Sequence, residues 1–198
     1  MDKHLNLWYI DNIFKDKVIF METFNVNING FSTDLPVLAL PSGIKIAFFN
    51  LHGNPKLTEH CGIELAKLVG DSEVLLTAES KGLQLTHVVA RELNHDFYAV
   101  ARKSKKLYMQ DGVSVAYGSS ITTGKAQEFF LSAHDVALIK GKKVCIVDDV
   151  ISTGESIDGL VHLVEKAGGI VNKKIFVLAE GDSKNREDIC FLATIPLL

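Results

Sequence analysis

The sequence is poor in the residues that define several specialised classes of protein. Its 198 residues contain only three cysteines and four prolines. The cysteines, Cys61, Cys145 and Cys190, are too few and too far apart for a disulfide framework. Two of them lie within apolar runs, where a thiol behaves as a small hydrophobic group. We therefore predict a protein of a reducing compartment.

An excess of one charge and a long apolar run are also missing. Lysine and arginine number 21 against 24 acidic residues, for a net charge of -3, which excludes nucleic-acid binding through overall charge. No apolar run approaches the roughly 18 residues of a membrane span. Asp2 and Asp11 occupy the region where a signal peptide is basic and then apolar. We expect a cytoplasmic protein with no membrane or nucleic-acid partner.

Helical and strand patterns alternate from residue 57 onward. Leu57, Cys61 and Leu65 recur at helical spacing, and the short apolar run of residues 73–78 is typical of a strand covered on both faces. This alternation predicts an α/β fold with a mostly parallel central sheet flanked by helices. The expected strands are residues 73–78, 96–101, 143–149, 170–179 and 189–195, and the expected helices begin near residues 57, 83, 134 and 155.

Two parts of the chain do not follow this alternation. Residues 113–131 alternate irregularly and contain two glycines, which predicts an antiparallel excursion with a flexible loop. Three of the four prolines lie between residues 36 and 55, where we expect strands broken by turns. We predict a single domain over residues 1–198, in which about residues 1–50 and the last ten residues form a small hood.

The most informative segment is VCIVDDVISTGES, residues 144–156. Asp148 and Asp149 end a buried strand, at the edge where open α/β sheets bind ligands. The helix that follows offers free backbone N–H groups, which favour phosphate. A ligand with both a sugar and a phosphate fits, because carboxylates bind ribose hydroxyls or help to place a divalent cation. The alternative is an ordinary strand end followed by a helix cap. The loop itself consists of Ser152, Thr153, Gly154, Glu155 and Ser156.

This thirteen-residue segment resembles the phosphoribosyl pyrophosphate motif of type I phosphoribosyltransferases. Residues 78–82, AESKG, resemble the pyrophosphate loop of the adenine-type enzymes, and residues 100–106, VARKSKK, resemble the basic start of their flexible catalytic loop. Residues 100–164 are also similar to the xanthine-type enzymes. The resemblance covers most of the chain after about residue 57 and implies the type I phosphoribosyltransferase fold with a hood.

The resemblance also implies a role for each matching residue. Asp148 and Asp149 would be catalytic, contacting the ribose hydroxyls and favouring positive charge at the anomeric carbon. Residues 152–156 would hold the 5′-phosphate. The pyrophosphate would meet Ser80, Lys81, Arg102, Lys103 and Lys106. No protein metal site is expected; Mg²⁺ would be held through the ligand, aided by Asp148.

The implied activity is transfer of a phosphoribosyl group from phosphoribosyl pyrophosphate to a purine base in purine salvage. Adenine is the favoured base, and xanthine or another 6-oxopurine is the alternative. A homodimer is expected from the resemblance. A second class of function stays open, a regulator that senses phosphoribosyl pyrophosphate without catalysis, although residues 1–40 lack the basic module of DNA-binding relatives.

Two residues depart from the family pattern. Glu155 stands where many members have glycine, which leaves phosphate binding intact if its side chain points outward. Thr122, ahead of Gly124 and Lys125, stands where the adenine-type enzymes have an acid that helps to move a proton at the purine ring. This second departure favours the regulator or a different base. Base recognition is expected from residues 26–41, with Phe31 as a stacking candidate, and from Glu180.

The remaining motifs are weaker indications of function. Residues 118–125 resemble a Walker loop only faintly, because five residues separate the glycines and Ala126 follows the lysine. The seven histidines, His60 and His162 among them, show no metal-ligand spacing. A phosphoacceptor receiver domain also ends a strand in acids, but those acids lie near the start of the chain, so we rank it last.

Overall fold

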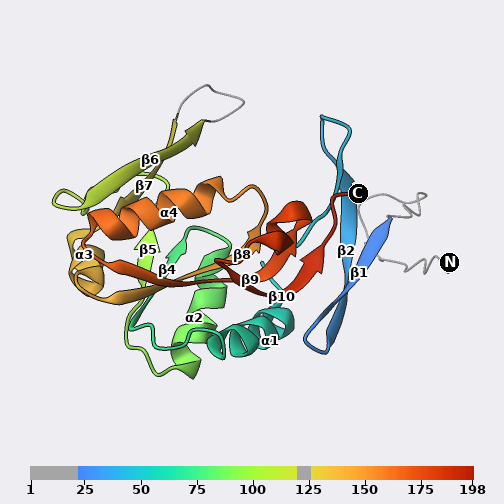
Figure 1. Cartoon of the computed structure of the whole chain (residues 1–198), viewed down its shortest axis with the longest axis horizontal. Helices are drawn as coiled ribbons and strands as arrows, with labels where there is room; N and C mark the ends of the chain where they lie inside the picture. Colours follow the sequence, from blue (N-terminus) through green and yellow to red (C-terminus); the bar gives the residue numbers. More distant parts are fainter. Residues whose placement is uncertain (1–21, 120–125) are drawn as a thin grey trace.

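The centre of the molecule is a parallel sheet. The computed structural model describes residues 22–119 and 126–198, and within them five parallel strands lie in the order β10-β9-β8-β4-β5 (Figure 1). This confirms the predicted α/β class. The strands are β4 (Val74–Ala78), β5 (Ala99–Ala101), β8 (Lys143–Ile151), β9 (Ile170–Glu180) and β10 (Cys190–Ile195).

Helices cover both faces of this sheet (Figure 1). Cys145 and Val147 of β8 pack in one apolar cluster with α1 and α2, whereas Val144 and Ile146 pack in a second cluster with α4. Successive residues of a strand point to opposite faces, so a strand covered on both sides is apolar throughout. The helices are α1 (Pro55–Ala66), α2 (Gly82–Glu92), α3 (Ala133–Ile139) and α4 (Glu155–Lys166).

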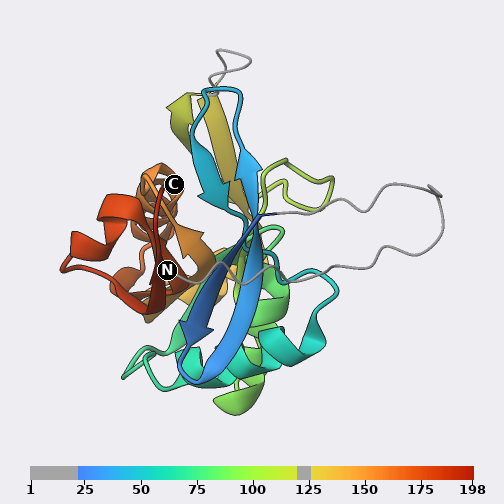
Figure 2. The ribbon, with the colours of Figure 1, turned by 90° about the vertical axis from the view of Figure 1, so that its right-hand side faces the viewer.

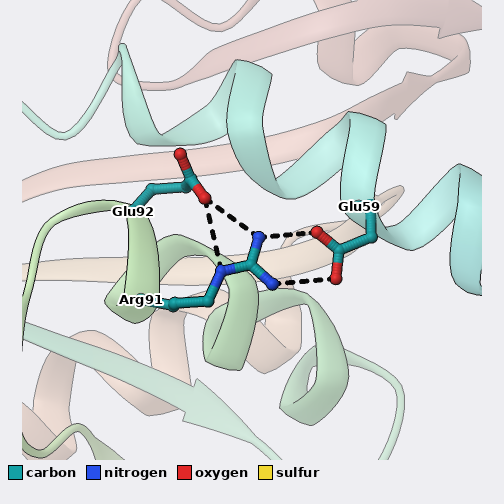
Figure 3. Close-up of polar contacts among 3 residues, drawn as sticks. All are labelled: Glu59, Arg91 and Glu92. Atoms are coloured by element: carbon teal, nitrogen blue, oxygen red, sulfur yellow. Dashed lines mark hydrogen bonds and ion pairs between the residues drawn. The ribbon is translucent and has the colours of Figure 1, made fainter.

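An ion-pair cluster on the surface joins α1 to α2 (Figure 3). Arg91 of α2 donates two hydrogen bonds to the carboxylate of Glu59 of α1, at 3.0 and 2.6 Å, and also contacts Glu92. All three side chains are exposed to solvent, where such pairs contribute little stability. The packing of the two helices therefore rests on the apolar cluster beneath them.

A hairpin extends the α4 side of the molecule. Strands β6 (Val113–Ser119) and β7 (Ala126–Leu131) pair antiparallel, as predicted for residues 113–131. Tyr117 and Phe129 stack at a centroid distance of 4.1 Å and are buried. Tyr117 also fits closely against Gly159 of α4, where a Cβ would lie 2.6 Å from the tyrosine Cβ. The glycine therefore lets the hairpin approach the helix.

A separate antiparallel sheet is formed by β1 (Thr23–Ile28), β2 (Phe31–Ala39) and β3 (Lys45–Ala47). It stands at the end of the molecule beside β10 (Figures 1 and 2). Lys45 and Leu198 exchange backbone hydrogen bonds, so the last residues of the chain extend this sheet. Residues 1–21 of the expected hood lie outside the described residues, and the single-domain assignment stays a prediction.

Three element boundaries differ from the prediction. β8 continues two residues past Asp149, because Val150 and Ile151 pair with β9 and Ile151 is buried. β5 begins at Ala99, three residues later than expected, since residues 99–101 alone pair with β4. α1 begins at Pro55, where the side chain of Asn54 caps it. None of the helices in residues 22–119 and 126–198 has the length and apolar character needed to cross a bilayer.

Candidate functional site

The predicted site residues come from three neighbouring strands. β8, β4 and β5 lie side by side and run parallel, so the segments that follow them meet at one edge of the sheet. We name two of these segments the β4 loop (residues 79–82) and the β8 loop (residues 152–156). The third is the basic segment, residues 102–106. The structure thus brings the three predicted segments to the same edge.

Asp149 occupies the centre of this edge. Its side chain is buried, and Oδ2 has no hydrogen-bond partner among residues 22–119 and 126–198. The ammonium of Lys81, from the β4 loop, lies 3.4 Å from the same oxygen. A buried carboxylate oxygen with one loose ion pair is costly in the free protein. Asp149 therefore presents an acceptor that a hydroxyl group or a cation would satisfy.

Asp148 is enclosed by the start of α2. Its Oδ1 accepts a hydrogen bond of 2.9 Å from the backbone N–H of Asp149 and lies 3.1 Å from the place where a Cβ on Gly82 would be. Burial, followed by the negative charge of Asp149, raises the pKa of the Asp148 carboxyl to about 7. The two adjacent acids therefore differ in setting, and Asp148 gains or loses its proton near neutral pH.

The β8 loop exposes its hydroxyl groups. Ser152, Thr153 and Ser156 are exposed, and Gly154 takes the N-cap position of α4 with φ +89°. No side chain in the described structure caps α4, so the alternative of an ordinary helix cap does not account for these hydroxyls. Glu155 reaches toward β6, where its Oε2 would lie 2.8 Å from a Cβ on Gly118. Its carboxylate thus lies against the hairpin.

The β4 loop is more tightly packed than the β8 loop. A Cβ on Gly82 would lie 2.1 Å from Oγ1 of the buried Thr77. Ser80 is exposed, and the N-cap position of α2 belongs to Lys81, which makes no side-chain cap hydrogen bond within the described residues. Ser80 is therefore not the residue that caps α2. Lys81 also lies over the ring of Phe48, 5.4 Å from its centroid.

The basic segment is only partly available to a ligand. Arg102 lies with its Nε 2.7 Å from Oε2 of Glu79, and the backbone N–H of Lys103 donates to the same carboxylate at 2.6 Å. Lys103 is exposed, favours the charged form of Asp148, and lines a cavity of about 360 Å³ beside Tyr117. Lys106 donates to Ser104 at 2.6 Å. Glu79 therefore holds the segment at the sheet edge and neutralises one of its charges.

Several residues at this edge escaped the sequence analysis. The hydroxyl of Tyr117 donates to Gln127 at 3.0 Å and also contacts Ser156, and burial raises the pKa of this tyrosine. Phe48 borders Lys81, and Arg186 lies against Gly154. Each contact joins residues far apart in the chain, and no local spacing marks them.

The candidates for base recognition, Phe31 and Glu180, lie outside the β4 loop, the β8 loop and the basic segment. Phe31 packs against His60 of α1, with ring centroids 5.3 Å apart, and contributes to the cluster on the α1 and α2 face. It therefore behaves as a packing residue. Glu180 ends β9 and pairs with Ile195 of β10. Thr122 and Lys125 lie outside the described residues.

The described residues hold no group of three or more histidine, cysteine or acidic side chains arranged for a metal ion. The adjacent carboxylates of Asp148 and Asp149 lie at this edge, and Oδ2 of Asp149 is buried without a hydrogen-bond partner among the described residues. Two carboxylates suit a hard cation that takes its other oxygen ligands from a bound phosphate compound and water. The donor set therefore fits Mg²⁺ delivered with a ligand.

Comparisons with known proteins show the family to which the chain belongs. Residues 50–193 match the phosphoribosyl transferase domain. The chain is 33% identical over 140 residues to adenine phosphoribosyltransferase of Methanococcus maripaludis, covering 69% of this chain and 76% of the relative. It is 34% identical over 149 residues to xanthine phosphoribosyltransferase of Bacillus cereus, covering 71% and 73%.

A solved structure has the same fold. The crystal structure of adenine phosphoribosyltransferase from Thermoanaerobacter pseudethanolicus superposes with a TM-score of 0.65 and 26% identity, over 81% of this chain and 95% of that one. The molecule is thus an α/β protein of the phosphoribosyltransferase fold. The chain belongs to the phosphoribosyl transferase domain family, which confirms the resemblance read from residues 144–156.

Proposed function

We propose that this protein transfers the 5-phosphoribosyl group from phosphoribosyl pyrophosphate to a purine base, with adenine favoured, yielding a nucleoside monophosphate and pyrophosphate. The observation that carries the proposal is Asp149, whose buried Oδ2 has no hydrogen-bond partner in the described part of the chain and faces Lys81 of the β4 loop. Relatives at similar identity are named adenine and xanthine phosphoribosyltransferases. A homodimer and a cytoplasmic location stay predictions.

The two acids and the β8 loop would bind the phosphorylated sugar. Residues 152–156 supply hydroxyls and the first backbone N–H groups of α4, which suit the 5′-phosphate. Asp149 would accept a hydrogen bond from a ribose hydroxyl and thereby satisfy Oδ2. Asp148, beside it, would add negative charge once it has lost its proton. Together they favour the positive charge that develops on the sugar as its bond to pyrophosphate breaks.

The β4 loop and the basic segment would bind the leaving pyrophosphate. Lys81, which follows Ser80, lies beside Asp149, and Lys103 lies near Asp148. Arg102 and Lys106 would add charge, Arg102 after exchanging its contact with Glu79 for one with pyrophosphate. Positive charge on this side and negative charge on the sugar side stabilise opposite ends of the breaking bond.

Mg²⁺ is the cofactor that fits this arrangement. Asp148 and Asp149 would help to hold it, with the remaining ligands supplied by pyrophosphate and ribose oxygens. Bound there, the ion would neutralise the leaving pyrophosphate. The protein residues then fix the ligand and exclude water from the activated sugar.

A panel of bases tests the proposed reaction. Purified protein with phosphoribosyl pyrophosphate and Mg²⁺ is supplied with adenine, hypoxanthine, guanine or xanthine, and nucleotide formation is measured by chromatography. We expect turnover with adenine. Turnover with xanthine alone would instead assign the 6-oxopurine activity, which the xanthine-type relatives and Thr122 favour. Silence on every base, with ligand binding retained, would reject the enzyme and support the regulator.

A further inference from the structure

Arg186 is a partly buried residue that lies outside all the motifs of the predicted site. It follows the short 3-10 helix η1 (Gly181–Asn185), which connects β9 to β10, and its side chain is 29% exposed. A Cβ on Gly154 would lie 2.3 Å from Arg186 Nη1, so the guanidinium occupies the space beside that glycine. Gly154 is the residue from which α4 starts.

The guanidinium is fixed from its other side. Its Nε and Nη2 donate to the two oxygens of Asp188 at 3.0 and 2.9 Å, and Asp188 also pairs with Lys174 of β9. Asp158, in the first turn of α4, lies 3.9 Å from Nη2. A bidentate pair of this kind fixes the plane of the guanidinium as well as its position. Nη1 is therefore held toward the β8 loop.

The segment that carries Arg186 is also anchored to the other end of the loop. Ser183 of η1 is buried, and its hydroxyl donates at 2.9 Å to the carbonyl of Ile151, the residue directly before the loop. The backbone N–H of Arg186 donates to the carbonyl of Ser183 at 3.1 Å. One short segment thus contacts the residue before the β8 loop, through Ser183, and the middle of the loop at Gly154, through Arg186.

We propose that Arg186 is a positioning residue for the phosphate site of the β8 loop. It holds the backbone of Gly154, and with it the amides at the start of α4, in the place that the 5′-phosphate needs. This inference rests on the proposed function, because it assumes that the loop binds a phosphate. Gly154 is required for the same reason, since a side chain there would displace the guanidinium.

The test compares two ligands that occupy different loops. Binding of ribose 5-phosphate and of pyrophosphate, each with Mg²⁺, is measured by calorimetry for the wild type, Arg186→Ala and Arg186→Lys. We expect Arg186→Ala to weaken the binding of ribose 5-phosphate about tenfold, which is the loss typical of one hydrogen bond to a charged group. Binding of pyrophosphate should weaken less than about twofold. Arg186→Lys keeps the charge but loses the fork, so we expect it to resemble Arg186→Ala. Full binding by Arg186→Lys would overturn the positioning role.

A matched control removes the same charge from the same segment. Lys184 is exposed on η1, and Lys184→Ala should leave both affinities unchanged. If Arg186→Ala fails to fold, Asp188→Asn keeps the arginine and removes its anchor, and we expect a smaller loss confined to ribose 5-phosphate. Equal losses for both ligands, or none, would overturn the inference. Failure of the wild type to bind either ligand would instead reject the proposed function.

A mutant cycle gives an independent measure of the contact. Gly154→Ala should weaken the binding of ribose 5-phosphate in the wild-type background, where the new Cβ meets Nη1 of Arg186. In the Arg186→Ala background that clash is gone, so the same substitution should cost less. Additive losses in the double variant would show that the two residues act independently and would overturn the inference.

Discussion

The β4 loop and the β8 loop lie at the same edge of the sheet, and each leads into a helix. Gly82, in the β4 loop, is enclosed by Thr77 and Asp148, which are themselves buried or nearly so. The β8 loop instead exposes its hydroxyl groups and is contacted just before its start by Ser183 and at Gly154 by Arg186. The first loop is held by packing at Gly82, although its Ser80 is exposed, and the second is held at two points.

This difference matches the ligands proposed for each loop. A packed loop keeps a fixed shape and presents few groups, here Ser80 and Lys81, of which Lys81 lies beside Asp149. An exposed loop offers many donors to one phosphate but needs supports to keep them in place. Substitutions in the two loops should therefore have different effects, stability being affected mainly in the β4 loop and ligand affinity mainly in the β8 loop.

The largest expected effect comes from removing both kinds of sugar-phosphate contact. Phosphoribosyl pyrophosphate with Mg²⁺ should raise the melting temperature of the wild type, because the ligand binds only the folded state. Asp149→Asn combined with Thr153→Ala removes a carboxylate and a loop hydroxyl, and we expect the ligand-induced shift to disappear in differential scanning fluorimetry. Asp96→Asn, an exposed acid before β5, is the control and should keep the full shift. A full shift in the double variant would place the ligand elsewhere.

The second prediction compares alanine at the two glycines. A Cβ on Gly82 meets a buried threonine oxygen at 2.1 Å, so we expect Gly82→Ala to lower the free energy of unfolding by about 3 kcal/mol. Gly154→Ala meets the end of the Arg186 side chain rather than a buried threonine, and must adopt φ +89°, at a cost of about 1 kcal/mol. Urea unfolding measures both. Equal losses, or a greater loss for Gly154→Ala, would contradict the contrast between the loops.

Features that depend on local sequence patterns can be predicted from the sequence, whereas contacts between residues far apart in the chain cannot. The parallel sheet follows from alternating helix and strand patterns, and the meeting of three segments follows from the geometry of parallel strands. The close fit of Gly82 against Asp148 does not follow, because it depends on how α2 packs. Likewise, Arg102, Lys103 and Lys106 are predicted to meet pyrophosphate, but Glu79 of the β4 loop engages Arg102.

The end of β8 shows the same limit. The acids were expected to end the strand, since polar residues usually mark its exposed edge. Ile151 pairs with Ala179 and is buried, so the strand carries both acids within its paired length. This longer strand places Ile151 where Ser183 reaches its carbonyl. The support of the β8 loop thus depends on two residues that the local pattern did not mark.

The third prediction concerns the proton on Asp148. Its pKa of about 7 means that the free protein is half protonated near neutral pH, whereas Mg²⁺ and ribose hydroxyls favour the ionised form. Affinity for phosphoribosyl pyrophosphate should therefore rise about tenfold from pH 6 to pH 8. The ratio of wild-type affinity to that of Asp148→Asn cancels titration of the ligand. A ratio independent of pH would contradict the raised pKa.

The same proton has a consequence for stability. The pKa of this carboxyl is higher in the folded state than its ordinary value of 3.8, so the folded state binds more protons between these two values. Unfolding free energy should consequently be constant below about pH 4, where the contribution of this group is fully present, and should fall as pH rises to about 7, where that contribution is lost. Asp148→Asn should remove this part of the slope in urea unfolding measured across the range.

The smallest expected effect comes from the ion pairs between α1 and α2 (Figure 3). Because they lie outside both loops, a substitution there is a reference for the substitutions within the loops. Glu59→Gln keeps the shape of the side chain and removes the charge that holds Arg91, on helices that also share an apolar cluster. Because these groups are exposed, we expect a small loss of stability that vanishes in high salt, and unchanged binding of ribose 5-phosphate and pyrophosphate. A loss of pyrophosphate binding would show that the exposed surface of α2 influences the β4 loop, which lies at the start of that helix. Local packing alone would then not fix the loop.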